Sequence, residues 1–80
     1  MYHVYILKPK DNSYYVGSSG NLEQRLFSHE RGRVRSTKNK LPFRLIHKES
    51  YDGRSEAQTR EYQIKGWKSR AAIERLIKKE

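Results

Sequence analysis

Hydrophobic and polar residues alternate in two short runs near the start of the chain. Residues 3–7 and 14–17 are rich in β-branched and aromatic side chains, and the segment between them contains Pro9, Asp11 and Asn12. Two such runs around a turn-forming cluster are typical of a β-hairpin. We therefore predict two neighbouring strands at this end of the chain.

Side chains point alternately to the two faces of a strand, which predicts which hairpin residues lie together. In the first strand Tyr5 shares a face with His3 and Leu7, and in the second Tyr15 shares one with Gly17. If the strands pair so that Tyr5 and Tyr15 project together, two phenols lie side by side. The glycine would then leave room for a ligand backbone.

A helix is predicted after the hairpin. Asn21 followed three residues later by Gln24 resembles a capping box, and Gly32 is a typical C-cap. The apolar positions that would face the core are Leu22, Leu26 and Phe27. Arg25 and His29, four residues apart, lie one above the other along the edge of that stripe.

A third strand is predicted over residues 43–51, followed by a turn at 52–53. In a regular strand this alternation places Phe43, Leu45 and His47 on one face.

Two more helices complete the pattern. Ser55 and Gln58 form a second capping box, which predicts a helix from Ser55 to about residue 65. Residues 66–68 break or bend it, and Ser69 can cap a last helix. The expected core positions here are Ile64, Trp67, Ile73, Leu76 and Ile77. The order strand, strand, helix, strand, helix, helix predicts an α+β fold in one domain, residues 1–80.

Charge points to a polyanionic partner. Among 80 residues, 18 Lys and Arg oppose nine Asp and Glu, a formal net charge of +9. Such an excess on a small domain favours nucleic acid, although a ribosome-associated protein or a charge that only maintains solubility is also consistent with it. The absence of cysteine excludes disulfides and thiolate metal sites. Without a long apolar run or a signal-like segment, we expect no membrane partner and a cytoplasmic location.

The most basic stretch, residues 31–40, contains no acid and is predicted to be an exposed loop that contacts phosphates. Its cationic residues are Arg31, Arg33, Arg35, Lys38 and Lys40. The alternative is a solvated loop without a binding role.

Several segments together resemble the GIY-YIG nuclease domain over nearly the whole chain. The segments are Val4-Tyr5, Tyr15-Val16-Gly17, Asn21-Leu22 with Arg25, and Glu61 on a later helix. The match looks closest to small single-domain members of the branch that also contains the N-terminal domain of the nucleotide-excision repair nuclease.

The resemblance implies a three-stranded antiparallel sheet flanked by helices, and cleavage of DNA phosphodiester bonds with one divalent cation, Mg²⁺ or Mn²⁺. Carried over to this sequence, the metal ligand is Glu61, and the catalytic residues are Tyr5, Tyr15, Arg25 and His29. We also expect Gly17 and Asn21 to contact nucleic acid.

The identity of the general base is a hypothesis. A free tyrosine has a pKa near 10, so a phenol acts as base only where positive charge lowers that pKa by several units. A histidine with a pKa near 6.5 is the simpler base. We expect Tyr15 to orient or deprotonate the water while His29 tunes it or accepts the proton, and Arg25 to bind a phosphate oxygen.

Each of these residues also has a structural explanation. The tyrosines can be strand aromatics packed on a helix, and Glu61 can pair with Lys65 at i+4. The sequence also departs from the family pattern: His3 replaces the first motif's glycine, Ser18 and Ser19 follow the second motif, and Ile73 stands where several members carry asparagine. These departures suggest a weak or selective nuclease.

Two interpretations of function follow. The first is an endonuclease acting on structured or damaged duplex DNA in repair or recombination, with selectivity supplied by DNA shape or a protein partner. The second is a non-catalytic nucleic-acid-binding module that retains the fold. A role in RNA or ribosome binding rests on charge alone.

Overall fold

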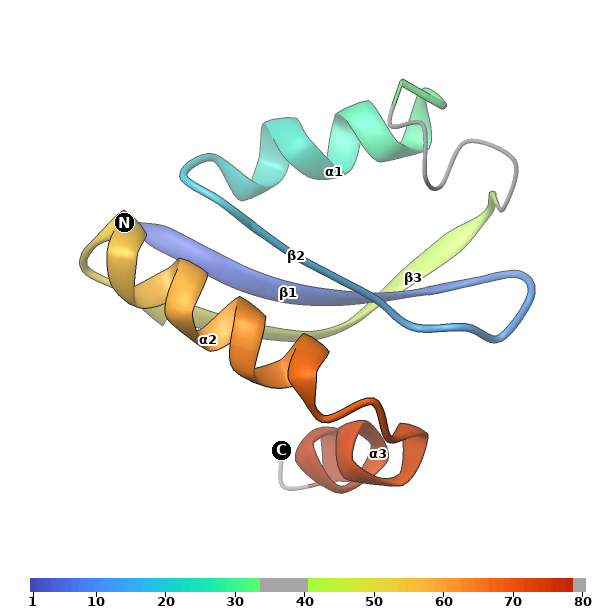
Figure 1. Cartoon of the computed structure of the whole chain (residues 1–80). Helices are drawn as coiled ribbons and strands as arrows, with labels where there is room; N and C mark the ends of the chain where they lie inside the picture. Colours follow the sequence, from blue (N-terminus) through green and yellow to red (C-terminus); the bar gives the residue numbers. More distant parts are fainter. Residues whose placement is uncertain (34–40, 79–80) are drawn as a thin grey trace.

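The computed structural model describes residues 1–33 and 41–78, and a three-stranded antiparallel sheet lies at its centre (Figure 1). The strands are β1 (Tyr2–Pro9), β2 (Tyr15–Ser19) and β3 (Phe43–Tyr51). Their spatial order is β2-β1-β3, so the first strand is central and β2 forms one edge. The predicted hairpin and third strand are confirmed.

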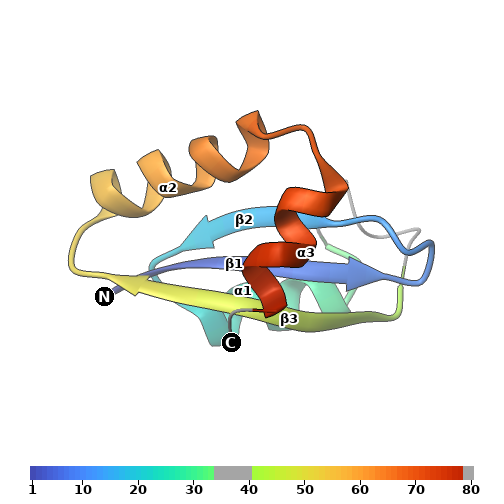
Figure 2. The same cartoon turned by 90° about the horizontal axis from the view of Figure 1, so that it is seen from below.

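Helices cover both faces of this sheet (Figures 1 and 2). One face carries α1 (Leu22–Glu30), and the other carries α2 (Arg54–Gly66) and α3 (Arg70–Lys78). The order β-β-α-β-α-α confirms the predicted α+β class. Within the described residues, no helix is long and apolar enough to cross a membrane.

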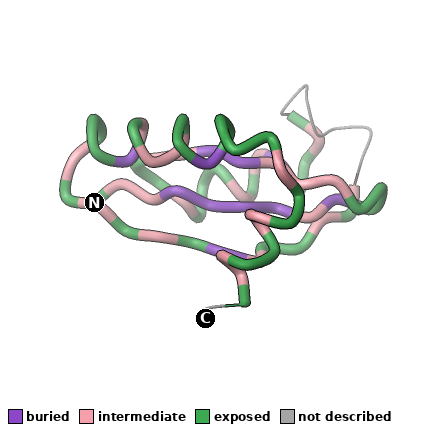
Figure 3. The backbone as a smooth tube through the Cα atoms, turned by 60° about the horizontal axis from the view of Figure 1, so that its bottom comes forward, coloured by how far each residue is buried: buried purple, intermediate pink, exposed green. Residues whose placement is uncertain are grey.

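The main core lies between the sheet and α2. Val4, Ile6 and Val16 project from the strands, and Ala57 and Ile64 meet them from the helix. Figure 3 shows the central strand as the longest buried stretch, because helices cover it from both sides. Side chains from α3 extend this core: Ile73 and Leu76 pack against it as predicted.

A side chain caps the N-terminus of two of the three described helices, as predicted. The Asn21 side chain accepts a hydrogen bond from the Gln24 backbone N–H at 3.1 Å, and Ser69 accepts one from that of Ala72 at 3.3 Å. Both predicted caps are therefore confirmed. The predicted cap at Ser55 is wrong: the helix starts one residue earlier.

The helix starts early because Gly53, which is extended at φ −128° and ψ 160°, serves as the N-cap of α2. No side chain caps this end. Ser55 thus lies inside the first turn, where its backbone carbonyl accepts a hydrogen bond from Thr59 Oγ1 at 2.9 Å.

Two apolar residues expected in the core lie at the surface instead. Phe27 is 48% exposed and Trp67 37% exposed. Trp67 follows the last residue of α2, and its ring meets the Arg60 guanidinium, 5.5 Å from the ring centroid. Phe27 is covered in the same way by Arg31, at 4.8 Å. Each large ring is thus shielded by a cation rather than by core packing.

A β-bulge corrects the predicted face of the third strand. Ile6 pairs with His47 while Leu7 pairs with Leu45, so Ile46 is the extra residue. The bulge turns His47 to the α2 face, while Phe43 and Leu45 remain on the α1 face. The expectation that these three side chains share one face is therefore wrong.

Because of the bulge, His47 joins a polar network that connects β3 to α2. Glu49 accepts hydrogen bonds from Arg60 Nε at 2.9 Å and Tyr51 Oη at 2.5 Å, and His47 Nε2 lies 2.7 Å from its other oxygen. Burial by itself raises the pKa of Glu49, but hydrogen bonds from these three residues lower it to about 2.

The low pKa of Glu49 predicts acid sensitivity. A carboxylate whose pKa falls on folding stabilises the protein above its ordinary pKa, and this contribution is lost as the pH drops toward 2. We expect Glu49→Gln to lower the free energy of unfolding at pH 7 by on the order of 1–3 kcal/mol. The difference from wild type should shrink between pH 5 and pH 2 in urea titrations.

Glu74→Gln is the matched control, because Glu74 is exposed on α3. This variant should track wild type across the same pH range. A difference between wild type and Glu49→Gln that did not change with pH would contradict the role given to the network.

Candidate active site

The hydroxyl of Tyr5 is the meeting point of the site residues. Tyr5 projects from the central strand and is fully buried. Its oxygen lies 3.2 Å from His29 Nε2 and 3.4 Å from Arg25 Nε, both carried by α1. Because an arginine only donates, the phenol oxygen accepts from Arg25, and its own proton is left for the histidine.

Gly17 creates the space in which the Tyr5 ring lies. The two residues are directly paired across the hairpin. A Cβ at position 17 would lie 2.6 Å from the Tyr5 hydroxyl oxygen and 2.7 Å from Cζ. The space expected for a ligand backbone is thus filled by the phenol, and contact between Gly17 and nucleic acid remains a prediction.

Aromatic rings surround His29, which is fully buried. The centroid of its ring lies 5.1 Å from that of Tyr15, 5.9 Å from that of Tyr5 and 5.7 Å from that of Phe43, all edge to face. The two phenols lie side by side as predicted, 6.4 Å apart with 34° between their planes. Sequence reasoning misses Phe43, because the sequence does not indicate which helix its face would meet.

Burial and charge set the protonation states in this cluster. Burial raises the pKa of the Tyr5 phenol, although the hydrogen bond from Arg25 opposes the shift. Burial and the Arg25 charge lower the pKa of His29, which favours the neutral imidazole. Arg25 donates a hydrogen bond to Tyr5, which is the main cause that raises the pKa of Arg25, and the neighbouring Tyr15 raises this pKa further. The guanidinium therefore stays charged beside both phenols.

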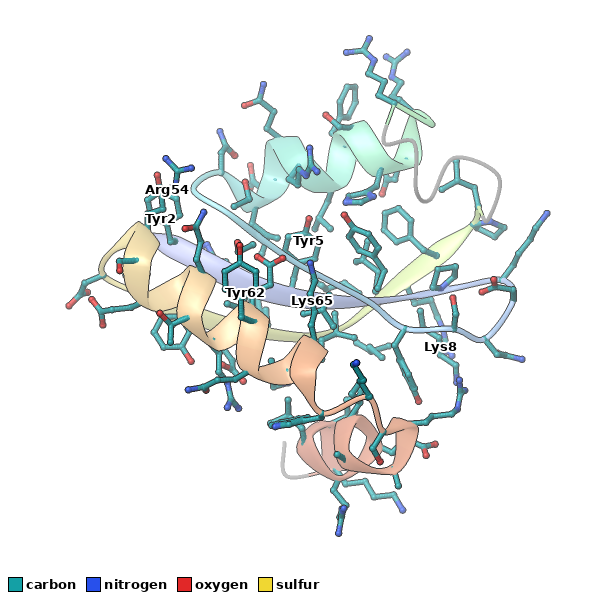
Figure 4. The ribbon with its side chains drawn as sticks, viewed as in Figure 1. Tyr2, Tyr5, Lys8, Arg54, Tyr62 and Lys65 are labelled. Carbon is teal, nitrogen blue, oxygen red and sulfur yellow. The ribbon has the colours of Figure 1, made fainter. Side chains whose placement is uncertain are left out.

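Glu61 lies on α2, on the other face of the sheet from the phenol cluster. Its carboxylate accepts a hydrogen bond from Ser18 Oγ at 2.5 Å and forms an ion pair with Lys65 Nζ at 2.6 Å. Lys65 extends from α2 toward β2 (Figure 4). The negative charge of Glu61 is among the influences that raise the pKa of Tyr5, after burial and the neighbouring Tyr15.

Ser18, which departs from the family pattern, holds the carboxylate in place. Because Ser18 pairs with Val4, it shares the face covered by α2. Strand alternation alone would have predicted that Ser18 points to the other face of the sheet from Tyr15 and Gly17. The predicted i+4 pairing of Glu61 with Lys65 is confirmed.

The chemistry of Glu61 fits a magnesium-like cation. In the described ranges no group of three or more His, Cys, Asp or Glu side chains could hold a metal. Mg²⁺ does not need one, because it keeps several waters and binds through one or two carboxylates plus substrate phosphate. The Glu61 side chain is 16% exposed, and its ion pair with Lys65 would have to open for a cation to bind there.

The predicted DNA-contacting residues are only partly brought together. Asn21 caps α1 and lines a small cavity beside Arg25. Arg31 and Arg33 are exposed at the far end of that helix, whereas Arg35, Lys38 and Lys40 lie outside the described residues. His3, placed on the Tyr5 face, has a buried Nδ1 without a hydrogen-bond partner within the described residues.

Comparison with known proteins finds similar sequences that cover most of this chain. Residues 1–77 match a family model described as the GIY-YIG catalytic domain. A UPF0213 protein of Halobacterium salinarum is 40% identical over 78 residues, which is 96% of this chain and 100% of that protein. A UPF0213 protein of Staphylococcus haemolyticus is 43% identical over 65 residues, 80% of this chain and 79% of that protein.

A solved structure is also similar. The solution NMR structure of a UPF0213 protein from Bacillus halodurans has a TM-score of 0.64 at 34% sequence identity. The alignment covers 98% of this chain and 84% of that one.

The close approach of Tyr5 and Gly17 is testable by adding one methyl group. Gly17→Ala should displace the phenol and lower the free energy of unfolding by about 1–3 kcal/mol. Gly66→Ala is the control, because a Cβ there meets nothing within 4 Å and alanine suits a helix better than glycine. Urea unfolding would measure both, and equal effects of the two variants would refute the proposed contact.

Proposed function

Since the chain belongs to the GIY-YIG family, we propose that it is a divalent-metal-dependent endonuclease that hydrolyses DNA phosphodiester bonds. One observation carries the proposal. Arg25 donates a hydrogen bond to the buried Tyr5 hydroxyl on one face of the sheet, and Ser18 of the edge strand β2 binds the Glu61 carboxylate on the other face. These contacts support a basic group for phosphate and a hard carboxylate for a cation on the two faces of one sheet edge.

The four residues on α1 and the sheet have different roles because their exposure differs. Tyr5 is fully buried, so it acts as a positioning residue that orients Arg25 and His29. Tyr15 is only partly buried and is the phenol able to meet substrate. Arg25 is exposed beyond its hydrogen bond, so its remaining N–H groups can bind a phosphate oxygen.

In this proposal Tyr15 orients the attacking water, and Arg25 lowers the cost of negative charge on that phenol. His29 starts as the neutral imidazole, because burial and the Arg25 charge lower its pKa, and it accepts the proton of the Tyr5 hydroxyl while that hydroxyl takes up the proton lost by the water. When bound at Glu61, a divalent cation would stabilise charge on phosphate and on the leaving oxygen. The family and the hard carboxylate favour Mg²⁺ or Mn²⁺.

Phosphate contacts carry no sequence information, so we propose structured or damaged duplex DNA as substrate, in repair or recombination and in the cytoplasm. DNA shape or a protein partner would supply selectivity. The net charge of +9 supports a polyanionic substrate. Contacts by Arg31, Arg33 and the basic residues beyond them are part of the proposal.

Cleavage of labelled DNA tests this function. Duplex, single strand, flap, nicked and four-way-junction DNAs would be incubated with Mg²⁺ or Mn²⁺. We expect metal-dependent products, and a loss of rate of at least about a hundredfold in Glu61→Gln. Glu74→Gln, which removes an exposed acid on α3, should cleave like wild type.

The same assay tests the role of the partly buried phenol. Tyr15→Phe should slow cleavage strongly, whereas Tyr62→Phe should not, because Tyr62 is 70% exposed on α2 (Figure 4). Unchanged turnover in both Tyr15→Phe and His29→Ala would rule out the assigned proton path. Tight DNA binding without products under either metal would instead support the non-catalytic binding module.

A further inference from the structure

A cavity of about 460 Å³ lies beside the proposed cleavage site, between β2 and the two helices of the opposite face. Its volume falls within the range of small-molecule sites, about 300–1,000 Å³. The side chains that define its chemistry are Tyr14, Ile64, Lys65, Lys68, Arg70 and Ile73. The cavity is therefore bounded by the sheet edge, by α2 and by α3.

The walls combine an apolar floor with a cationic rim. Ile64 is fully buried and Ile73 packs on the core, so both can contribute only at the bottom. Lys68 and Arg70 are exposed, so their charges surround the opening. Within the described residues no acid lines this cavity.

An aromatic ring already paired with cations forms part of the wall. The Arg70 guanidinium lies 4.5 Å from the centroid of the Tyr14 ring, and the Lys8 ammonium lies 5.9 Å from it. Aromatic rings and arginine planes are the surfaces on which unpaired nucleobases stack. An apolar floor, a ring and a basic rim together suit a ligand with a flat base and an anionic phosphate.

The cavity adjoins the proposed metal ligand directly. Lys65 lines it and also binds Glu61 at 2.6 Å. Tyr15 lines it as well, although its side chain points to the α1 face, so the cavity borders the strand that carries this phenol. A ligand here would therefore lie close to a cation bound at Glu61.

We propose that this cavity is a subsite for one unpaired nucleotide of the substrate strand, with the base against Tyr14 and Arg70 and its phosphate at Lys68. The subsite rests on the proposed nuclease function and deepens it. A base in a duplex remains stacked and cannot enter, so the cavity would select DNA in which a nucleotide next to the cut is unpaired.

Binding without chemistry tests the subsite. Fluorescence anisotropy in EDTA would compare a blunt duplex with the same duplex bearing a single-nucleotide flap. We expect wild type to bind the flap duplex roughly tenfold more tightly, as stacking of one base allows. Arg70→Ala and Tyr14→Leu should each lose most of this preference.

Arg75→Ala is the matched control for Arg70→Ala, because Arg75 lies on the same helix and lines a different cavity, with Trp67. It should keep the preference for the flap. Tyr14 also packs against the core, so thermal unfolding would verify that Tyr14→Leu is folded. The result for Arg70→Ala does not depend on this check, because Arg70 is exposed. Equal wild-type affinity for both duplexes, or a preference that survives Arg70→Ala, would overturn the subsite.

Competition separates this proposal from others. Displacement of the flap duplex by deoxynucleoside monophosphate supports the subsite, whereas displacement by an acidic peptide alone would indicate a protein-docking surface and overturn it. Because no metal is present, the outcome is independent of cleavage. Cleavage without a preference for the flap duplex would contradict the subsite but not the nuclease function. A preference for the flap duplex without cleavage would contradict the nuclease function but not the subsite.

Discussion

The buried hydroxyl of Tyr5 is the interaction on which the rest of the structure depends. A buried phenol must find hydrogen-bond partners, and its ring must find space. Gly17 provides the space, since a Cβ there would lie within 2.7 Å of the ring. Arg25 and His29, one helical turn apart on α1, provide the partners and thereby fix this helix over the sheet. The Tyr5 side chain thus links the hairpin, this helix and the cluster.

The edge position of β2 explains how both faces of the sheet contribute to one site. Tyr15 and Gly17 point to the α1 face, and Ser18 points to the α2 face, where it binds Glu61. In a central strand, the neighbouring strands on both sides would separate the residues of one face from those of the other. At the edge they can act on the same ligand, and the cavity lined by Tyr14 and Lys65 continues from that edge toward α3.

Much of the fold follows from local patterns. The hairpin, the Asn21 cap and the element order were predictable because they depend on strand alternation, turn residues and capping chemistry. The cap of α2 was not, since Gly53 satisfies its start by backbone conformation rather than by a side chain. The bulge at Ile46 was not either, because only pairing with β1 reveals the extra residue.

For the site, family resemblance supplied the residues and most of their expected roles, but not the difference between the two phenols. Alternation placed the two phenols together, yet burial distinguishes them, and burial depends on α1 and on the packing of Phe43 against His29. Likewise, the size of Trp67 suggests a core residue. Because α2 ends just before it, Trp67 lies at the surface against Arg60. This placement depends on tertiary packing, which the hydrophobic pattern of the sequence does not predict.

The most direct test of the central claim is whether a divalent cation binds at Glu61, next to the phenol cluster. Backbone amide NMR signals would be recorded during titration with Mn²⁺, which broadens resonances near its binding site, with and without a short DNA duplex. The account predicts that the signals of Ser18 and Lys65 broaden first, that Mg²⁺ reverses the effect and that Glu61→Gln abolishes it. Broadening centred on another carboxylate, or an unchanged pattern in Glu61→Gln, would contradict the account.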